Sequence, residues 1–374
     1  TRNAVVAVAF FIALFGVALW QGSGRHVGDV HPGSPELRAD SRFNRDAVTI
    51  VEKFSLGLDV LTVIVETPEG SCIDYGAMQY LNELSWHIQN VPGVLSVASV
   101  PVIAKQINAG GAEGNLKWAT LPRNRYLLVR AVGHLPEETG LLNAECTLMP
   151  IYAFTADHKA ETIKRAIAAV HEFRESHPRD DIRIRLASGS VGVQAAINEE
   201  LERSEAPIML YVYAAIIALV LVTYRDWRAT ICCCVPLGVA TVSGYWFMKE
   251  LEIGLKVATM PVMVLAVGLG VDYAFYIYNR LQFHLSEGLD VTTAYQQTLF
   301  ETGNAVIFTA VTLAIGVSTW SFSALKFQAD MGLLLTFMFM VNMVMAVTML
   351  PALAVTIDLI VPRRHRVKVP TIGL

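Results

Sequence analysis

The sequence predicts an α-helical membrane protein that carries an α+β extracytoplasmic domain. Of its 374 residues, 53% are hydrophobic and only 17% are charged, which is too apolar for an ordinary water-soluble chain. Six apolar stretches reach or approach the roughly 20 residues that a helix needs to cross a bilayer. Charged residues gather instead between Arg25 and Arg203, where strand and helix patterns alternate.

The six apolar stretches are arranged as one followed by five. They cover residues 4–20, 207–224, 230–248, 257–279, 305–324 and 332–361. The first is interpreted as a span rather than a cleaved signal, because its apolar run is long and Trp20-Gln21 is a poor cleavage site. Pro207 is expected to begin the second span, since the first helical turn tolerates proline. Pro351 is expected to kink the last span.

The basic residues of the short loops predict the orientation. One set of loops holds Arg2, Arg225, Arg228 and Arg280, and the basic tail at 362–374 lies on the same side. Because cytoplasmic loops carry the excess of Lys and Arg, both termini are expected in the cytoplasm. The predicted domains are therefore a first transmembrane helix (1–20), an outer domain (21–206), a five-helix membrane bundle (207–361) and a cytoplasmic tail (362–374).

The outer domain shows two successive β-α-β patterns. Strands are predicted at 59–66, 94–103, 146–155 and 182–187. Apolar residues at helical spacing (Ala77, Leu81, Leu84, Ile88) predict the first intervening helix, and Asp157 is expected to cap the second. The segment 105–123 is rich in Gly and Asn and is interpreted as a loop. This order predicts a split β-α-β (ferredoxin-like) sandwich inserted after the first helix.

Several classes of function find no support in the sequence. The formal net charge of −4 comes without a basic cluster of the size that nucleic acid requires. The histidines show neither metal-ligand spacing nor a partner nucleophile, so no catalytic site, metal or cofactor is predicted. Cys72 and Cys146 are interpreted either as a disulfide, contributing about 4 kcal/mol in an oxidising compartment, or as two buried thiols.

One acidic residue stands inside an apolar span. Asp272 and Tyr273 lie within residues 257–279, just after Gly268 and Gly270. A carboxylate there costs about 2.5–3.5 kcal/mol on insertion scales, so it marks an ion path or proton relay. Low polarity favours its uncharged form, the Tyr273 hydroxyl can bind a partner carboxylate, and the glycines let a neighbouring helix approach closely. The alternative is an Asp held in a helix–helix hydrogen bond without titrating.

Other polar residues are predicted at similar depth. Thr309, Thr312 and Asn342 are candidates for a relay with Asp272, although threonines in spans often bond their own backbone. Near the cytoplasmic side, Asp358 is expected to pair with Arg363. A short helix capped by Asp290 is expected either to lie on the membrane surface, with Val291, Ala294, Tyr295 and Leu299 facing the bilayer, or to serve simply as a linker.

The one-plus-five topology with an Asp-Tyr pair in the fourth span resembles one half of a resistance-nodulation-division (RND) transporter. The similarity is closer to the branch that holds the mycobacterial membrane protein large (MMPL) family and the hopanoid exporters. Residues 270–274 and 278–280 resemble the proton-relay helix of that branch, and residues 302–306 and 350–353 are also similar to it. Residues 27–38 resemble the segment after the seventh span, which identifies the chain with the C-terminal half.

This resemblance implies a proton-driven exporter of lipidic or amphiphilic substrates in the bacterial inner membrane, with residues 21–206 as a periplasmic porter domain. Asp272 and Tyr273 would carry the proton. The partner would be the N-terminal half of the same transporter or a second six-helix unit, which supplies the matching pair. Two alternatives stay open: a Sec-type accessory of protein translocation, and a non-transporting lipid sensor similar to the sterol-sensing relatives, in which Asp272 is structural.

Overall fold

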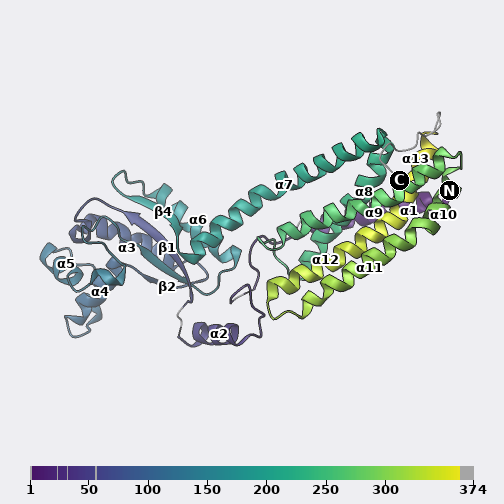
Figure 1. Cartoon of the computed structure of the whole chain (residues 1–374). Coiled ribbons are helices and arrows are strands. Elements are labelled where there is room, and N and C mark those ends of the chain that lie inside the picture. Colours follow the sequence, from purple (N-terminus) through teal and green to yellow (C-terminus); the bar gives the residue numbers. More distant parts are fainter. Residues whose placement is uncertain (1, 23, 32, 55–56, 363–374) are drawn as a thin grey trace. The chain divides into compact units, whose positions relative to one another are not determined.

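The computed structural model describes residues 2–22, 24–31, 33–54 and 57–362. The chain divides into two compact units, which we call the bundle (Thr1–Val30 with Leu201–Leu374) and the α/β unit (His31–Glu200). Helices dominate the bundle, whereas the α/β unit contains a small antiparallel sheet (Figure 1). One helix, α7, begins in the α/β unit and ends in the bundle.

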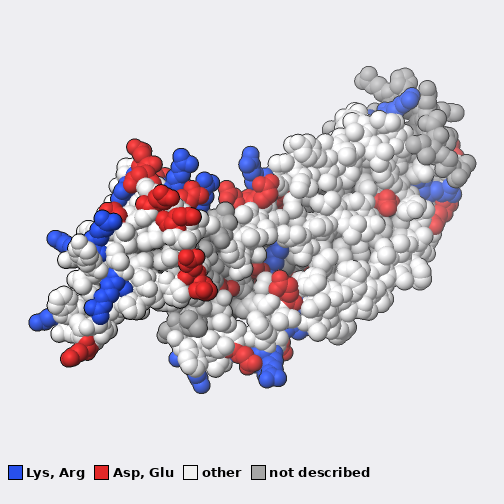
Figure 2. Space-filling model, turned by 60° about the vertical axis from the view of Figure 1, so that its left-hand side comes forward, with Lys and Arg blue, Asp and Glu red and all other residues white. Residues whose placement is uncertain are grey.

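The bundle is built from long apolar helices. Its elements are α1 (Arg2–Gly22), α7 (Gly189–Tyr224), α8 (Trp227–Glu250), α9 (Met260–Ser286), α10 (Val291–Thr298), α11 (Asn304–Ser318), α12 (Lys326–Val344) and α13 (Leu350–Ile360). Within the described residues, six helical stretches are long and apolar enough to cross a membrane. Figure 2 shows that the visible surface of the helical bundle is largely free of charged residues, as a hydrocarbon environment requires. The protein is therefore a multi-pass membrane protein.

Helix α7 extends further toward the N-terminus than its hydropathy suggests. It begins at Gly189, so Pro207 lies inside it, and the prediction that Pro207 begins the span was wrong. The preceding residues include several Glu and Ala, which favour a helix, although the segment is too polar to be recognised as a span. Proline has no N–H, so the Arg203 carbonyl loses the donor four residues ahead of it.

Pro351 interrupts the last span as expected. Helix α12 ends at Val344, a π-helical turn covers Met345–Met349, and α13 begins at Leu350. The proline leaves the Val347 carbonyl without its usual helical donor. The Tyr295 hydroxyl donates to that carbonyl at 2.8 Å, which satisfies a backbone group that water cannot reach inside a bilayer.

The short helix α10 is capped as predicted but faces another way. The Asp290 carboxylate accepts hydrogen bonds from the backbone N–H groups of Thr292 and Thr293. Ala294 is fully buried and Tyr295 reaches the last span, so the predicted orientation toward the bilayer was wrong. Helix α10 packs on α9. This contact buries its apolar residues against protein, whereas a position on the lipid surface would bury them less completely.

The α/β unit contains a four-stranded sheet in the order β2-β3-β1-β4, and each neighbouring pair is antiparallel. Its elements are α2 (Arg42–Phe54), β1 (Asp59–Glu66), α3 (Tyr75–Gln89), β2 (Val94–Ala98), α4 (Val100–Gly110), α5 (Arg125–Val132), β3 (Ile151–Thr155), α6 (Ala160–Ser176) and β4 (Arg183–Ser188). Short 3-10 turns lie at Ser71–Ile73 (η1), Leu116–Trp118 (η2) and Glu137–Thr139 (η3). In chain order, β-α-β is followed by a second β-α-β.

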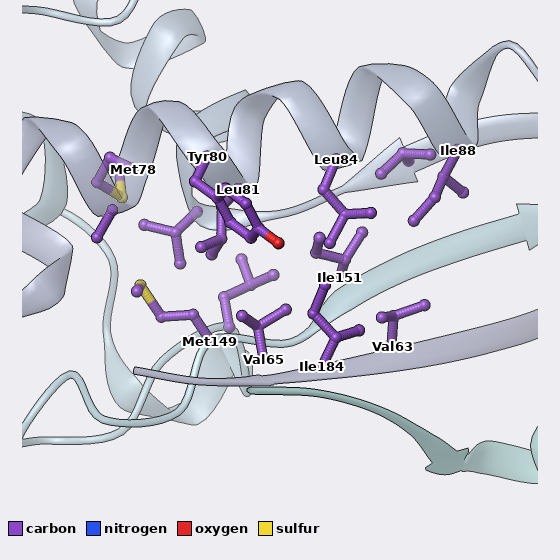
Figure 3. Packing of buried hydrophobic residues seen from close by; sticks show 14 of the residues in the cluster. Val63, Val65, Met78, Tyr80, Leu81, Leu84, Ile88, Met149, Ile151 and Ile184 are labelled. Atoms are coloured by element: carbon purple, nitrogen blue, oxygen red, sulfur yellow. The ribbon is translucent and has the colours of Figure 1, made fainter. Parts of the chain in front are cut away.

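Helix α3 packs against the sheet through the face that the sequence predicts. Figure 3 shows Leu81, Leu84 and Ile88 pointing toward Val63 and Ile151 of the sheet. These side chains are almost inaccessible to solvent. Burying an aliphatic side chain of this size contributes about 1.5–3 kcal/mol, so this layer accounts for much of the stability of the unit.

Four predictions in the α/β unit were wrong. Strand β2 ends at Ala98 and β3 begins only at Ile151. The stretch 105–123 is not wholly a loop, because α4 continues to Gly110. Asp157 lies ahead of the helix rather than capping it, and Lys159 is the N-cap residue of α6. The strand errors follow from short apolar runs, which fit a strand and one face of a helix equally well.

Cys72 and Cys146 form a disulfide, with their Cα atoms 5.5 Å apart. The bridge joins the turn before α3 to the chain just ahead of β3. It therefore closes the segment containing α4 and α5 into a covalent loop. In an oxidising compartment this connection restricts the unfolded chain and stabilises the inserted segment.

Candidate functional site

Asp272 lies near the middle of α9, on a face of the helix that this chain leaves exposed. The exposed stripe repeats every three or four residues and consists of Leu265, Gly268, Asp272, Tyr276 and Asn279. Among the described residues, no hydrogen bond or ion pair is formed by the Asp272 carboxyl group. A helix repeats every 3.6 residues, so all five side chains lie on one side of α9.

Tyr273 points the other way. Its ring is 3% exposed and packs among the apolar residues of the bundle core. Its hydroxyl oxygen is buried and has no hydrogen-bond partner in the described part of the chain. Neighbouring residues on a helix are about 100° apart, so the Asp-Tyr pair presents its acid outward and its phenol inward.

Asn342 links α12 to the buried side of α9, the helix that carries Asp272. It is buried, and its amide Nδ2 donates to the Ala266 carbonyl oxygen at 3.0 Å. Gly270 makes this contact possible: a Cβ atom there would lie 2.5 Å from the Asn342 Cγ, closer than real contacts allow. Glycine is therefore needed at position 270 for the two helices to approach.

The remaining predicted relay residues lie on exposed surfaces. A Cβ added at Gly268 would meet nothing within 4 Å. Thr309 and Thr312 are exposed on α11, and each hydroxyl donates to the carbonyl four residues earlier, Ala305 and Phe308 respectively. The structure thus brings together Gly270 and Asn342, and no hydrogen bond joins Asp272 to the threonines in the described residues.

An acid exposed at mid-span has a clear energetic consequence. Facing lipid, it would cost about 2.5–3.5 kcal/mol even by insertion scales, and such residues usually face a protein partner or a water-filled cavity. The same stripe carries the small Gly268 and the polar Tyr276 and Asn279, which favour close contact with another helix. At this depth the Asp272 carboxyl group is more stable uncharged, and a cationic counter-group on a neighbouring surface would favour its charged form.

Two buried ion pairs at one end of the bundle were missed by the sequence analysis. Arg25 follows α1 and pairs with Glu205 of α7 at 2.5 Å, while its guanidinium lies 4.6 Å from the Tyr245 ring centroid. Asp29 pairs with Lys256 at 2.5 Å. The sequence signal that could have found them is position, because these are single charged residues close to apolar spans.

The same segment is held by backbone contacts. The Gly28 N–H donates to the Leu255 carbonyl, and the Leu255 N–H donates to the His26 carbonyl, both at 2.9 Å. A Cβ at Gly254 would lie 1.9 Å from the Gly28 carbonyl oxygen. The chain leaving α1 is therefore fixed to the connection between α8 and α9, the helix that carries Asp272.

Charged residues also meet at the opposite ends of these helices. Arg228 donates to the Val361 carbonyl at 2.8 Å and lies 3.4 Å from the Asp358 carboxylate. The predicted partner of Asp358, Arg363, lies outside the described residues. A second group, also missed from sequence, joins the buried His284 of α9 to Glu301 at 3.1 Å, and Arg280 contacts the same carboxylate.

Together, the apolar spans, the antiparallel sheet and the mid-span acid define a multi-pass membrane protein with a candidate ionisable site inside the membrane. The MMPL family profile matches residues 143–369, which is more than half of the chain. The chain belongs to the MMPL family, within the RND superfamily of membrane exporters, as the resemblance in its sequence indicated.

Curated relatives differ in how much of their length the chain covers. A membrane protein from Methanocaldococcus jannaschii is 24% identical over 309 residues, or 80% of this chain and 77% of that protein. The sulfolipid-1 exporter MmpL8 of Mycobacterium tuberculosis is 24% identical over 196 residues, 51% of this chain but 18% of the exporter. The Mycobacterium leprae transport protein MmpL10 is 23% identical over 48% of this chain and 19% of its own length. The chain thus spans less than a fifth of the mycobacterial relatives.

Proposed function

We propose that this chain is half of a proton-driven exporter of lipidic or amphiphilic substrates, and that Asp272 is the group that takes up and releases the proton. The observation that carries the proposal is an exposed carboxyl group at the middle of a membrane-spanning helix. Lipid cargo is supported by MmpL8, a relative named as a sulfolipid-1 exporter.

The missing partner is a second six-helix unit, either the N-terminal half of the same transporter or a separate chain. The exposed stripe of α9 would pack against it. This arrangement removes Asp272 from lipid and supplies a group that competes with the proton for the carboxylate. The M. jannaschii relative, which this chain covers for 77% of its length, supports the view that one such unit is a natural building block.

Protonation would alter the packing of α9. This change in packing would then be transmitted through the contacts between α9 and the chain segments beside it. A proton that crosses a membrane potential supplies about 2.3 kcal/mol per 100 mV. Gly28 and Asp29 are fastened to the connection that precedes α9, and Glu205 fastens α7, which continues into the α/β unit. The α/β unit would act as the porter domain, with its βαββαβ order and strand order β4-β1-β3-β2 supporting the split β-α-β assignment.

We further propose that the chain resides in a bacterial inner membrane, with both termini in the cytoplasm and the α/β unit in the periplasm. Arg228 contacts Asp358 and the Val361 carbonyl, so this basic residue lies at the end of the bundle where α13 finishes. Arg280 lies in the corresponding connection after α9. A disulfide between Cys72 and Cys146 suits the oxidising periplasm.

The test replaces Asp272 by Asn and by Glu in the assembled transporter, reconstituted in vesicles with an imposed proton gradient. Asn keeps the size and hydrogen bonding of the side chain but cannot titrate. Asp272→Asn should abolish lipid export and the accompanying proton flux, while the free energy of unfolding remains unchanged. Asp272→Glu should retain part of both the export and the proton flux. Asp40→Asn, which replaces an exposed acid outside the membrane spans, is the matched control and should retain proton flux.

Two results would redirect the assignment. Continued proton-coupled lipid export by Asp272→Asn would refute the role of this carboxyl group. Loss of polypeptide secretion with normal lipid export would instead favour a translocation accessory, and an unchanged lipid response without transport would favour a sensor.

A further inference from the structure

The α/β unit contains an open pocket of about 630 Å³ away from the membrane site. One wall is a face of α3, and the others come from α4, the turn η2 with the loop after it, and α5. The polar side chains that line it are Tyr75, Gln79, Asn82, Lys105, Asn108, Thr120, Arg123 and Asn124. Asn108 shapes the mouth, because its amide donates to the Trp118 and Thr120 carbonyls at 2.8 and 3.3 Å.

The pocket is basic and has unused hydrogen-bonding capacity. Lys105 forms no ion pair within the described part of the chain, and neither Asp nor Glu is among the described residues that line the pocket. Partial burial lowers the pKa of the Lys105 amine, because burial disfavours its charged form. Arg123 is exposed at the rim, with its guanidinium 5.9 Å from the Tyr75 ring centroid. No donor among the described residues reaches the buried side-chain oxygen of Asn82.

A second, more apolar pocket of about 240 Å³ adjoins the first. The two share Asn108, Trp118 and Leu127 as a common wall. The second is otherwise lined by Ile107, Gly111, Ala112, Ala131 and Arg130. Large apolar side chains remain exposed beside it, among them Trp118 at 52% and Leu127 at 41%. A basic, polar pocket therefore lies next to a more apolar one, and Trp118 lines both.

We propose that these joined pockets bind one anionic, single-chain amphiphile. Its acidic headgroup would pair with Lys105 and Arg123 in the larger pocket, and a headgroup donor would satisfy the Asn82 oxygen. Its hydrocarbon chain would pass Trp118 and Leu127 into the smaller pocket. A charge-assisted hydrogen bond to a partly buried lysine is stronger than a neutral one, so the headgroup would determine selectivity and the chain would add affinity.

This inference rests on the proposed function only for the idea that the ligand is cargo; binding itself needs neither a proton gradient nor the second unit. A free inorganic anion would use the same lysine but would leave the apolar pocket and the exposed tryptophan unoccupied. The position of a basic pocket directly beside an apolar one favours the amphiphile.

The test uses the full chain in lipid nanodiscs and a diazirine-bearing dodecyl phosphate as a photoaffinity probe, with labelled peptides mapped by mass spectrometry. Competitors are dodecyl phosphate, dodecylphosphocholine with the same chain, and inorganic phosphate. Variants are Lys105→Gln, Arg123→Gln and, as a matched control outside the pocket, Lys164→Gln. Thermal unfolding of each variant verifies that it is folded.

The expected result is labelling within residues 105–131 that dodecyl phosphate displaces about tenfold better than dodecylphosphocholine does, with little displacement by inorganic phosphate. Lys105→Gln or Arg123→Gln should weaken binding about tenfold while Lys164→Gln leaves it unchanged. Absence of labelling there, equal labelling in Lys105→Gln, or displacement by inorganic phosphate alone would overturn the proposal.

The Asp272→Asn chain separates the two hypotheses. It should lose transport but keep this labelling. If transport is lost and labelling in residues 105–131 is absent from every variant, the pocket assignment fails and the proton role survives. If labelling is normal and Asp272→Asn transports as well as the native protein, the proton role fails and the pocket assignment survives.

Discussion

Gly270 and Gly268 lie two positions apart on α9, yet the same substitution should affect them in opposite directions. In Gly270→Ala the new Cβ would lie 2.5 Å from the Asn342 Cγ and 2.6 Å from its Nδ2. The amide must then move, which breaks its 3.0 Å hydrogen bond to the Ala266 carbonyl. At Gly268 the same methyl group meets nothing within 4 Å.

The size of the effect follows from three contributions. An interhelical side-chain hydrogen bond in a membrane protein contributes about 0.6 kcal/mol on average and at most about 1.7 kcal/mol. Forcing a methyl group into a filled site costs about 1–3 kcal/mol. Replacing glycine by alanine within a helix returns about 0.5–1 kcal/mol. Gly270→Ala should therefore lower the free energy of unfolding by about 1–3 kcal/mol, and Gly268→Ala should raise it by up to about 1 kcal/mol.

The assay is steric-trap unfolding of the single full chain in bicelles, in which no second unit covers the α9 stripe. A double-mutant cycle with Asn342→Ala isolates the contact: with the amide removed, Gly270→Ala should lose most of its penalty, a coupling of about 1–2 kcal/mol. Equal effects at the two glycines, or an undiminished penalty in the Asn342→Ala background, would refute the packing argument.

Further predictions concern groups outside this contact. Replacing Cys72 and Cys146 by Ala should lower the stability of the α/β unit by about 2–4 kcal/mol, measured by denaturant titration with the reduced native chain as control; no loss would contradict a formed bridge. Burial lowers the pKa of Lys105 below its ordinary value of 10.5, so between the two values the unfolded chain binds the extra proton and stability rises with pH. Lys105→Met should therefore raise the melting temperature at pH 7.5, with the difference shrinking toward pH 10.5, and a constant difference would contradict this cause. Pro207→Ala should supply the donor that the Arg203 carbonyl lacks and slow hydrogen exchange in the middle of α7; faster exchange there would show that the proline is not the weak point.

Most of the membrane architecture could be predicted from the sequence, because its physical determinants are local. Hydropathy over about 20 residues identifies a span wherever it lies in the chain, and a lone acid within such a run, such as Asp272, is conspicuous for the same reason. Helix α3 was equally predictable, since its apolar residues recur at the helical period. Boundaries failed where the local signal was ambiguous, as at Pro207 and in the chain after Ala98.

The sequence by itself determined that this chain crosses a membrane, carries a β-α-β repeat and places an acid at mid-span. Only the tertiary structure decided that Asp272 points out of the bundle while Tyr273 and Asn342 point into it, and that Lys105 opens onto a pocket. The physical reason is that a span depends on composition along one helix, whereas the direction of each side chain depends on which neighbouring helices pack against it. Those neighbours, α12 beside α9 and α5 beside α4, come from distant or irregular parts of the chain, and no local pattern records their contact.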